Sequence, residues 1–313
     1  MMRKILIIVL SLIATVSYAQ ETDDSSTPWK WSKPAKRDYP VLNAMVYSAG
    51  YGIPLVSNNL MSDVWDQKMG YAAHFTVEYR KQFTEEKVIM NRTVEYPTLW
   101  AMGVGVGVST FSKSADLNIT SEQVNSLLDA DGDPYNAHLD YQGINEKFSL
   151  TYIDVPLYVE IGRPSRSKFK GWAKLGVKGS FLINDSFEGK GTYTARGYYP
   201  RWDVLLHDIP ELNFLTNQSA YSDSEYKMKS FVLWGTVSAG VSIPLSNYDA
   251  EIIRNVVLKL GVKYDFTITP VSDGSSESLF PGSKYRVNQS NYFGGSGSRL
   301  HYIGLEIGLI HSF

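Results

Sequence analysis

The chain has 313 residues, of which 43% are hydrophobic and 20% charged, with a formal net charge of −2 and no cysteine. This length suits one large domain. The near balance of charge argues against a nucleic-acid partner, which would call for a basic surface. The absence of cysteine excludes disulfides and thiolate metal sites.

The N-terminus has the pattern of a secretory signal peptide. Arg3 and Lys4 precede an almost unbroken apolar run over 5–16, which is too short to span a bilayer, and small residues suited to cleavage follow it. We therefore expect residues 1–19 to be a signal peptide. The polar, proline-containing stretch 20–40 is expected to be a flexible periplasmic tail.

From residue 41 onward, apolar residues recur at every second position, which is typical of β-strands with two different faces. In 98–112, for example, alternate positions from Trp100 to Val108 are large and apolar, while those between them are alanine or glycine. Eight segments of this kind are predicted as strands: 41–55, 69–83, 98–112, 146–163, 169–193, 228–246, 255–272 and 298–313.

The pattern favours a membrane barrel over a soluble sandwich. Many of these strands reach the ~10 residues that a tilted transmembrane strand needs, and their number is even. The connections at one end (56–68, 113–145, 194–227 and 273–297) are on average much longer than those at the other end. Aromatic residues near strand ends suggest two interfacial girdles: Tyr47, Tyr51, Tyr71, Tyr79, Trp100, Phe111, Tyr152, Trp172, Phe181, Phe231, Tyr264 and Tyr302.

We therefore predict a transmembrane antiparallel up-and-down β-barrel of about eight strands over residues 41–313, located in the outer membrane with lipid around it. Several sequence features are similar to PorT-like eight-stranded outer-membrane barrels. They are the Tyr18-Ala19-Gln20 ending of the signal, the segments 152–160 and 240–245, and a last strand ending in Phe313. The resemblance implies that the barrel-assembly machinery reads the last strand, so that Phe313 acts as an assembly signal. It implies no established activity.

The polar face of the predicted barrel carries a balanced set of charges. Five acids and five bases are expected to point into the lumen: Glu78, Asp154, Glu160, Asp265 and Glu306, with Arg80, Lys174, Lys178, Lys259 and Lys263. An eight-stranded barrel is just wide enough for side chains to fill it, and buried charges need partners. The set is interpreted as a filled structural core, with a narrow, gated solute path as the alternative. Pro156 interrupts a strand, where a bulge would accommodate it.

The long connection 113–145 contains a candidate calcium site. The carboxylates of Asp129, Asp131, Asp133 and Asp140 have the spacing of an EF-hand-type loop, after a stretch over 120–128 that is predicted to be a short helix. Pro134 stands where that loop needs glycine. The alternative is an ordinary Asp/Gly/Pro turn cluster.

The next long connection contains Arg196 and Trp202 with two tyrosines between them, and Trp65 and Tyr221 are expected on other outer loops. Such a group suits a glycan or protein partner; the alternative is mutual packing of the loops. The leading function is therefore a structural or surface-interaction role through the long extracellular loops. Transport through a narrow pore, and a lipid-modifying enzyme using a Ser/His pair such as Ser298 and His301, remain alternatives.

Overall fold

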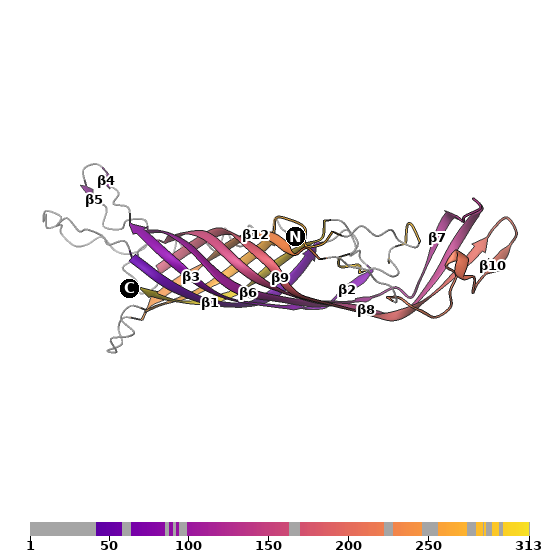
Figure 1. Ribbon diagram of the computed structural model, residues 1–313, viewed down its shortest axis with the longest axis horizontal. Helices are drawn as coiled ribbons and strands as arrows, with labels where there is room; N and C mark the ends of the chain where they lie inside the picture. Colours follow the sequence, from indigo (N-terminus) through magenta and orange to yellow (C-terminus); the bar gives the residue numbers. More distant parts are fainter. Residues whose placement is uncertain are drawn as a thin grey trace, which may run out of the picture.

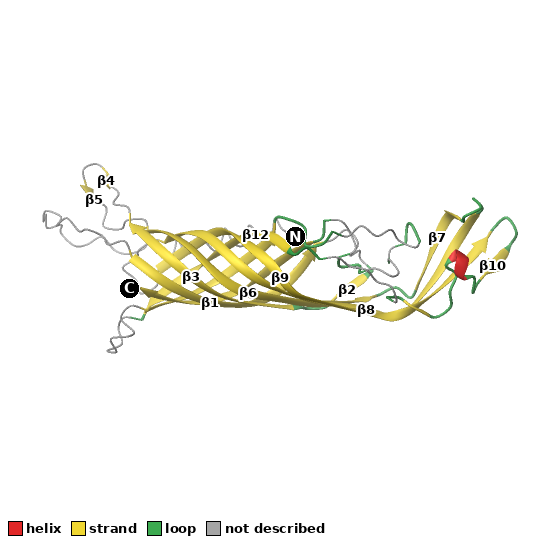
Figure 2. Cartoon of the chain, viewed as in Figure 1, coloured by secondary structure: helices red, strands yellow, loops and turns green. Residues whose placement is uncertain are grey.

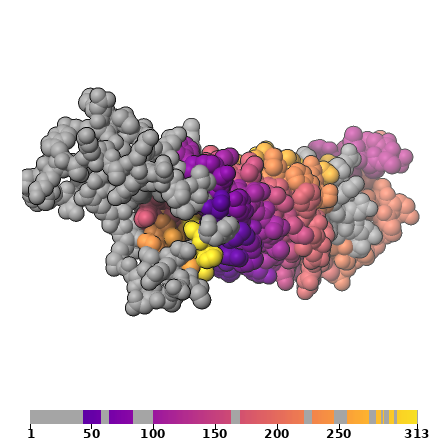
Figure 3. All heavy atoms as spheres, turned by 60° about the vertical axis from the view of Figure 1, so that its left-hand side comes forward, coloured from indigo at the N-terminus to yellow at the C-terminus, as the bar shows by residue number. Residues whose placement is uncertain are grey.

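The described part of the chain folds into a closed antiparallel β-barrel of eight strands, seen in the computed structural model of Figures 1 and 2. The barrel strands are β1 (Leu42–Ser57), β3 (Tyr71–Thr84), β6 (Leu99–Leu117), β8 (Pro134–Gly162), β9 (Lys170–Tyr199), β12 (Phe231–Pro244), β13 (Val256–Thr267) and β14 (Arg299–Ser312). Each pairs with the next along the chain, and β14 closes the barrel against β1 from Ala44↔Ser312 to Ser57↔Arg299. In Figure 3 the yellow last strand accordingly abuts the indigo first strand.

The structure describes residues 42–57, 64–84, 88–89, 92–93, 99–162, 170–221, 228–245, 256–273, 280–283, 285, 290–293 and 297–312. The expected signal peptide (1–19), the expected tail (20–40) and Phe313 lie outside this part of the chain. Among the described residues, no helix has both the length and the apolar character needed to cross a bilayer.

The wall of the barrel is apolar outside and polar inside. Along β8 the buried residues include Asp154 and Glu160. The apolar residues that alternate with this set are exposed: Ile153, Val155, Leu157, Val159 and Ile161. The predicted outward set on β6, from Trp100 to Val108, is likewise exposed. This alternation, with the aliphatic face turned outward, is that of a transmembrane barrel, and the predicted fold class is confirmed.

The predicted aromatic girdles are only partly right. Tyr47, Tyr51, Tyr71, Tyr79, Trp100, Phe181 and Phe231 are exposed on the outer surface. Four other members of the predicted set point inward and are buried: Phe111, Tyr152, Trp172 and Tyr302. Strand parity separates the two groups, because neighbouring side chains on a strand point to opposite faces.

Pro156 is accommodated without the expected bulge. The β6–β8 register runs through Val104↔Leu157 and resumes at Gly107↔Asp154 with no shift. Pro156 still lies opposite Lys178 on its other side. The missing proline N–H therefore interrupts the pairing with β6 locally and leaves the alignment of the strands intact.

Two barrel strands continue far beyond the wall and form an arm (Figure 1). We define the arm as β7 (Ser121–Leu128), residues 134–142 of β8, residues 192–199 of β9, and β10 (Val204–Leu206). These four segments form one sheet in the order β10-β9-β8-β7. The predicted helix over 120–128 is wrong, because this stretch is β7 and forms a hairpin with β8.

The joint between barrel and arm contains a register shift between Gln142 and Asn145 in the β8–β9 pairing. Two glycines with positive φ lie there, Gly143 (φ +62°) and Gly191 (φ +115°). The smaller elements are β2 (Trp65–Gln67), β4 (Val88–Ile89), β5 (Arg92–Thr93), the 3-10 helix η1 (Pro210–Leu212) and β11 (Gln218–Ser219).

Candidate functional site

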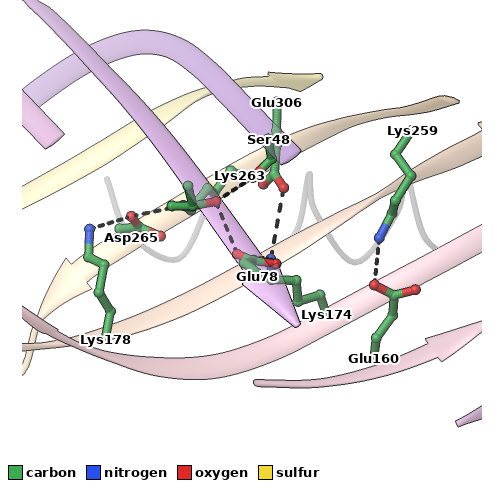
Figure 4. Close-up of polar contacts among 10 residues, drawn as sticks. Ser48, Glu78, Glu160, Lys174, Lys178, Lys259, Lys263, Asp265 and Glu306 are labelled. Atoms are coloured by element: carbon green, nitrogen blue, oxygen red, sulfur yellow. Dashed lines mark hydrogen bonds and ion pairs between the residues drawn. The ribbon is translucent and has the colours of Figure 1, made fainter. Parts of the chain in front are cut away.

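All ten predicted lumen charges lie inside the barrel, and each is at most 8% exposed. Lys174 Nζ is 3.2 Å from Glu78 and 3.9 Å from Glu306. Lys178 Nζ is 3.4 Å from Asp154 and 3.0 Å from Asp265, which Lys263 also approaches at 3.6 Å. Figure 4 shows these side chains, apart from Asp154, converging from different strands, with the Glu160–Lys259 pair to one side.

Glu160 has two cationic partners. Arg80 donates to it at 3.0 Å and Lys259 at 2.5 Å. Aromatic faces cover three of the ammonium groups: Lys174 over Tyr158, Lys178 over Trp234 and Lys259 over Trp172. Charge pairing and cation–π contacts together compensate for the removal of these groups from water.

The outer end of the lumen is packed with aromatic rings. Phe111 and Trp234 stack with centroids 5.4 Å apart, and Tyr152 meets both rings edge-on. Each of these rings is at most 2% exposed. The inward groups therefore pack against one another, as expected when an eight-stranded barrel fills its own interior.

Above the lumen lies a second aromatic group, which we call the mouth cluster: Trp65, Phe148, Tyr221, Tyr285, Tyr292 and Phe293. It joins β8 to segments from three outer connections. Trp65 and Tyr221, both expected on outer loops, pack against Tyr285, as the alternative of mutual loop packing predicts.

A fully buried carboxylate, Glu146, lies within the mouth cluster. The backbone N–H of Asn291 donates to it at 2.9 Å, the Asn291 side-chain amide at 2.8 Å, the Tyr292 N–H at 3.3 Å and the Tyr221 hydroxyl at 3.0 Å. The neighbouring lysine, Lys147, points outward and is exposed, so Glu146 lies beyond the apolar belt on the side of the arm. Burial raises the pKa of Glu146 to about 7, and the hydrogen bonds from Asn291 and Tyr221 act against that rise.

The four aspartates of the candidate calcium loop are not brought to one point. Asp129 accepts hydrogen bonds from the backbone N–H groups of Asp131 and Asp133 and so shapes the β7–β8 turn. Asp140 lies further along β8, where it pairs with Arg196. Within the described residues no three His, Asp or Glu side chains gather closely enough to share a metal ion. These contacts are those of an Asp-stabilised turn, and calcium binding by the loop stays a prediction.

The outer face of the arm carries a groove of about 910 Å³. Polar residues of β7, β8 and β9 line it, together with Asp203 just before β10, and Leu139 and Leu205 are its apolar members. The polar residues are Ser121, Glu122, Gln123, Asn136, His138, Asp140, Arg196, Tyr198 and Asp203. The opposite face of the arm is aromatic, since Tyr135 packs between Tyr199 and Phe214. This aromatic layer makes the arm a packed unit.

The predicted aromatic group around Arg196 is divided between these faces. Arg196 and Tyr198 line the groove, whereas Tyr199 is buried against Tyr135 and Trp202. Trp202 itself is half exposed at the tip. Adjacent residues of a strand point to opposite faces, so Tyr198 and Tyr199 lie on different faces of the arm. The sequence alone did not assign 194–199 to a strand, and so it did not show which face each tyrosine takes.

Among the described contacts, His301 pairs with Tyr264 and not with Ser298. The His301 ring stacks on Tyr264, and its Nδ1 lies 3.1 Å from the Tyr264 hydroxyl. Both Ser298 and His301 are buried. A nucleophile, a base and an orienting group within mutual reach would be needed for acyl transfer, and the described contacts of His301 supply none.

Comparisons with known proteins leave the family open. No family model and no curated protein matches the chain. Among solved structures the chain is similar to Neisserial surface protein A, with TM-score 0.31 and 12% identity over 87% of this chain and 97% of that one. It is also similar to Ail, the attachment invasion locus protein of Yersinia pestis, solved with the heparin analogue sucrose octasulfate, with TM-score 0.24 and 11% identity over 87% and 99%. The fold assignment rests on the strand pairing, and the PorT-like resemblance stays a prediction.

Two features of the site were not predicted from the sequence. The contact between Glu146 and Asn291 joins residues 145 positions apart, and no local pattern marks it. The groove is formed by residues 121–140 and 196–205, which the sequence assigned to connections. The alternation of Asn136, His138 and Asp140 with Ala137 and Leu139 is a local signal that could have indicated a strand there.

Proposed function

We propose that this chain is an outer-membrane β-barrel that makes contacts at the cell surface through its arm. The arm carries the proposal because four hydrogen-bonded strands, backed by an aromatic layer, hold a polar groove well outside the barrel (Figure 2). Connections that merely closed a barrel would not need such a built extension, since short loops suffice for that. Outer-membrane lipid and the barrel-assembly machinery are the partners that this location implies.

The barrel interior favours a structural role over transport. Its charges are paired with one another, and aromatic rings fill its outer end. Expelling Lys178 or Asp265 from its partner to admit a solute would leave a buried charge uncompensated, which is costly. The mouth cluster belongs to the same hydrophobic core as these rings. Planar-bilayer recording of the purified protein should therefore show no discrete channel openings, and regular openings would favour the transport alternative.

The surface role is tested with cells that express the intact chain or an arm-shortened variant. In the variant, residues 119–142 and 193–219 are each replaced by a short Gly/Ser turn, and a heat-dependent gel shift checks that the barrel still folds. Adhesion to mucin-coated and gelatin-coated surfaces is compared. Loss of adhesion with the arm supports the proposal. Equal adhesion to both surfaces by intact and shortened chains contradicts it.

A further inference from the structure

We propose that the groove on the outer face of the arm binds a neutral saccharide. This inference rests on the proposed surface role of the arm and names the class of ligand that the groove takes. It is carried by the placement of the polar side chains, by the contacts that hold them in place and by the balance of charge around them.

The groove residues lie in register across the sheet. One row runs Gln123, His138, Arg196, as given by the pairs Gln123↔His138 and His138↔Arg196. A second row runs Asn136, Tyr198, Leu205. Adjacent strands are ~4.8 Å apart and same-face residues on a strand are ~7 Å apart, so the polar groups form a regular grid. A grid of this kind suits a ligand whose polar groups repeat, as the hydroxyls of a saccharide do.

Neighbouring contacts hold these side chains in place. Gln123 Nε2 donates to Asn125 Oδ1 at 2.8 Å, and Asn136 Oδ1 accepts from the Ser126 N–H at 3.1 Å. Arg196 is paired with Asp140. The Tyr198 hydroxyl donates to Asp203 at 2.8 Å. Side chains that are already ordered lose less entropy when a ligand binds, which raises affinity.

The chemistry of the lining matches hydroxyl groups, which both donate and accept hydrogen bonds. The amides of Gln123 and Asn136 offer donors and acceptors side by side, and the unused N–H groups of Arg196 add donors. The Tyr198 ring, which His138 meets edge-on at 6.4 Å, supplies an aromatic surface for the C–H face of a sugar. The aliphatic Leu205 extends this surface.

The charge of the groove favours a neutral ligand over a sulfated or phosphorylated one. Asp140 and Asp203 place two carboxylates in the groove, against the single guanidinium of Arg196. That guanidinium is already paired with Asp140. The carboxylate of Glu122 turns to the opposite face of the sheet, where it accepts a hydrogen bond from the Tyr141 hydroxyl at 2.9 Å. An anionic ligand would therefore meet net negative charge, which disfavours its approach.

The test measures binding of purified full-length protein, in detergent micelles, to defined hexasaccharides by titration calorimetry. The neutral probes are cellohexaose, maltohexaose and N-acetylchitohexaose, and a heparin-derived hexasaccharide is the anionic probe. Tyr198→Ala removes the ring, whereas the matched variant Tyr198→Phe keeps the ring and loses only the hydrogen bond to Asp203. Gln218→Ala, on β11 outside the groove, is the control for substitution in the same part of the molecule.

We expect at least one neutral probe to bind, with affinity at least tenfold lower for Tyr198→Ala and within about threefold of the native value for Tyr198→Phe and Gln218→Ala. Protease resistance of the arm checks that Tyr198→Ala still folds, and Gln123→Ala, which should also weaken binding, provides a second variant if it does not. Preference for the heparin fragment, or no binding of any neutral probe, would overturn the inference. Arm-dependent adhesion to gelatin would then still support the surface role, so the two proposals fail separately.

Discussion

The backbone N–H of Asn291 lies 2.9 Å from the carboxylate of Glu146, although 145 residues separate them in the chain. This contact ties the connection between β13 and β14 to β8 at the arm end of the barrel. It places an ionisable group, without a cationic partner among its described contacts, at the centre of the mouth cluster. The stability of that cluster should therefore depend on pH.

Because the pKa of Glu146 is raised to about 7, the folded mouth binds a proton that the opened chain releases. The stabilisation is present at acidic pH and is lost as the pH rises from the ordinary carboxyl range through about 7. The chain has no native cysteine, so Ser290→Cys introduces a single buried reporter thiol in the mouth. Its rate of reaction with a maleimide is measured with Glu146 present and with Glu146→Gln. We expect the ratio of the two rates, Glu146 over Gln, to be several-fold higher at pH 8 than at pH 5.5. Comparing the two proteins at each pH cancels the pH dependence of the thiol. The same ratio at both pH values would contradict the expectation.

If the apolar belt faces lipid, two arginine substitutions at similarly exposed positions should differ greatly in their cost to the free energy of unfolding. Val106 and Leu128 are 55% and 67% exposed, but only Val106 lies on the barrel wall. Val106→Arg should lower the free energy of unfolding in lipid vesicles by about 2–4 kcal/mol. Leu128→Arg, at the tip of the arm, should change it by less than about 0.5 kcal/mol. Equal costs in guanidinium titrations would mean that the wall does not face lipid.

The barrel could be predicted from the sequence because its determinants are local. Alternation over 98–112 assigns each residue from Trp100 to Val108 to a face, and strand parity then places Glu78 or Lys178 inside. The arm could not be predicted in the same way. Ser121–Leu128 has a bulged register between Val124 and Leu127, which disrupts the two-residue period. Its strand character comes from pairing with β8, a contact that propensity alone does not encode.

The lumen charges should behave as a coupled set. Lys178→Met removes the partner that Asp154 has at 3.4 Å, while Asp265 keeps Lys263. Leaving Asp154 buried and unpaired should cost about 3–5 kcal/mol in unfolding free energy. Adding Asp154→Asn restores charge balance and should recover a large part of that loss. The double-mutant cycle checks this, and strictly additive costs would show that the two residues are not coupled.

The joint of the arm depends on glycine at one position more than at its neighbour. A Cβ on Gly191 would come 2.7 Å from the Cα of Ile144 and 2.8 Å from the carbonyl oxygen of Gly143, at a φ of +115°. A Cβ on Gly143 would meet nothing within 4 Å, and its φ of +62° is one that other residues can adopt at modest cost. Gly191→Ala should therefore loosen the joint, whereas Gly143→Ala should be milder by about 1–2 kcal/mol.

The rate of limited trypsin cleavage after Lys190 and Arg196, which flank the joint on β9, measures this difference in local stability. We expect cleavage at least tenfold faster in Gly191→Ala than in Gly143→Ala, because about 1.4 kcal/mol of local stability corresponds to a tenfold change in the open population. The heat-dependent gel shift should stay the same in both variants, since the barrel pairing below the joint is untouched. Parallel loss of that shift in Gly191→Ala would mean that the arm and the barrel fold as one unit and not as a barrel that carries a separately ordered extension.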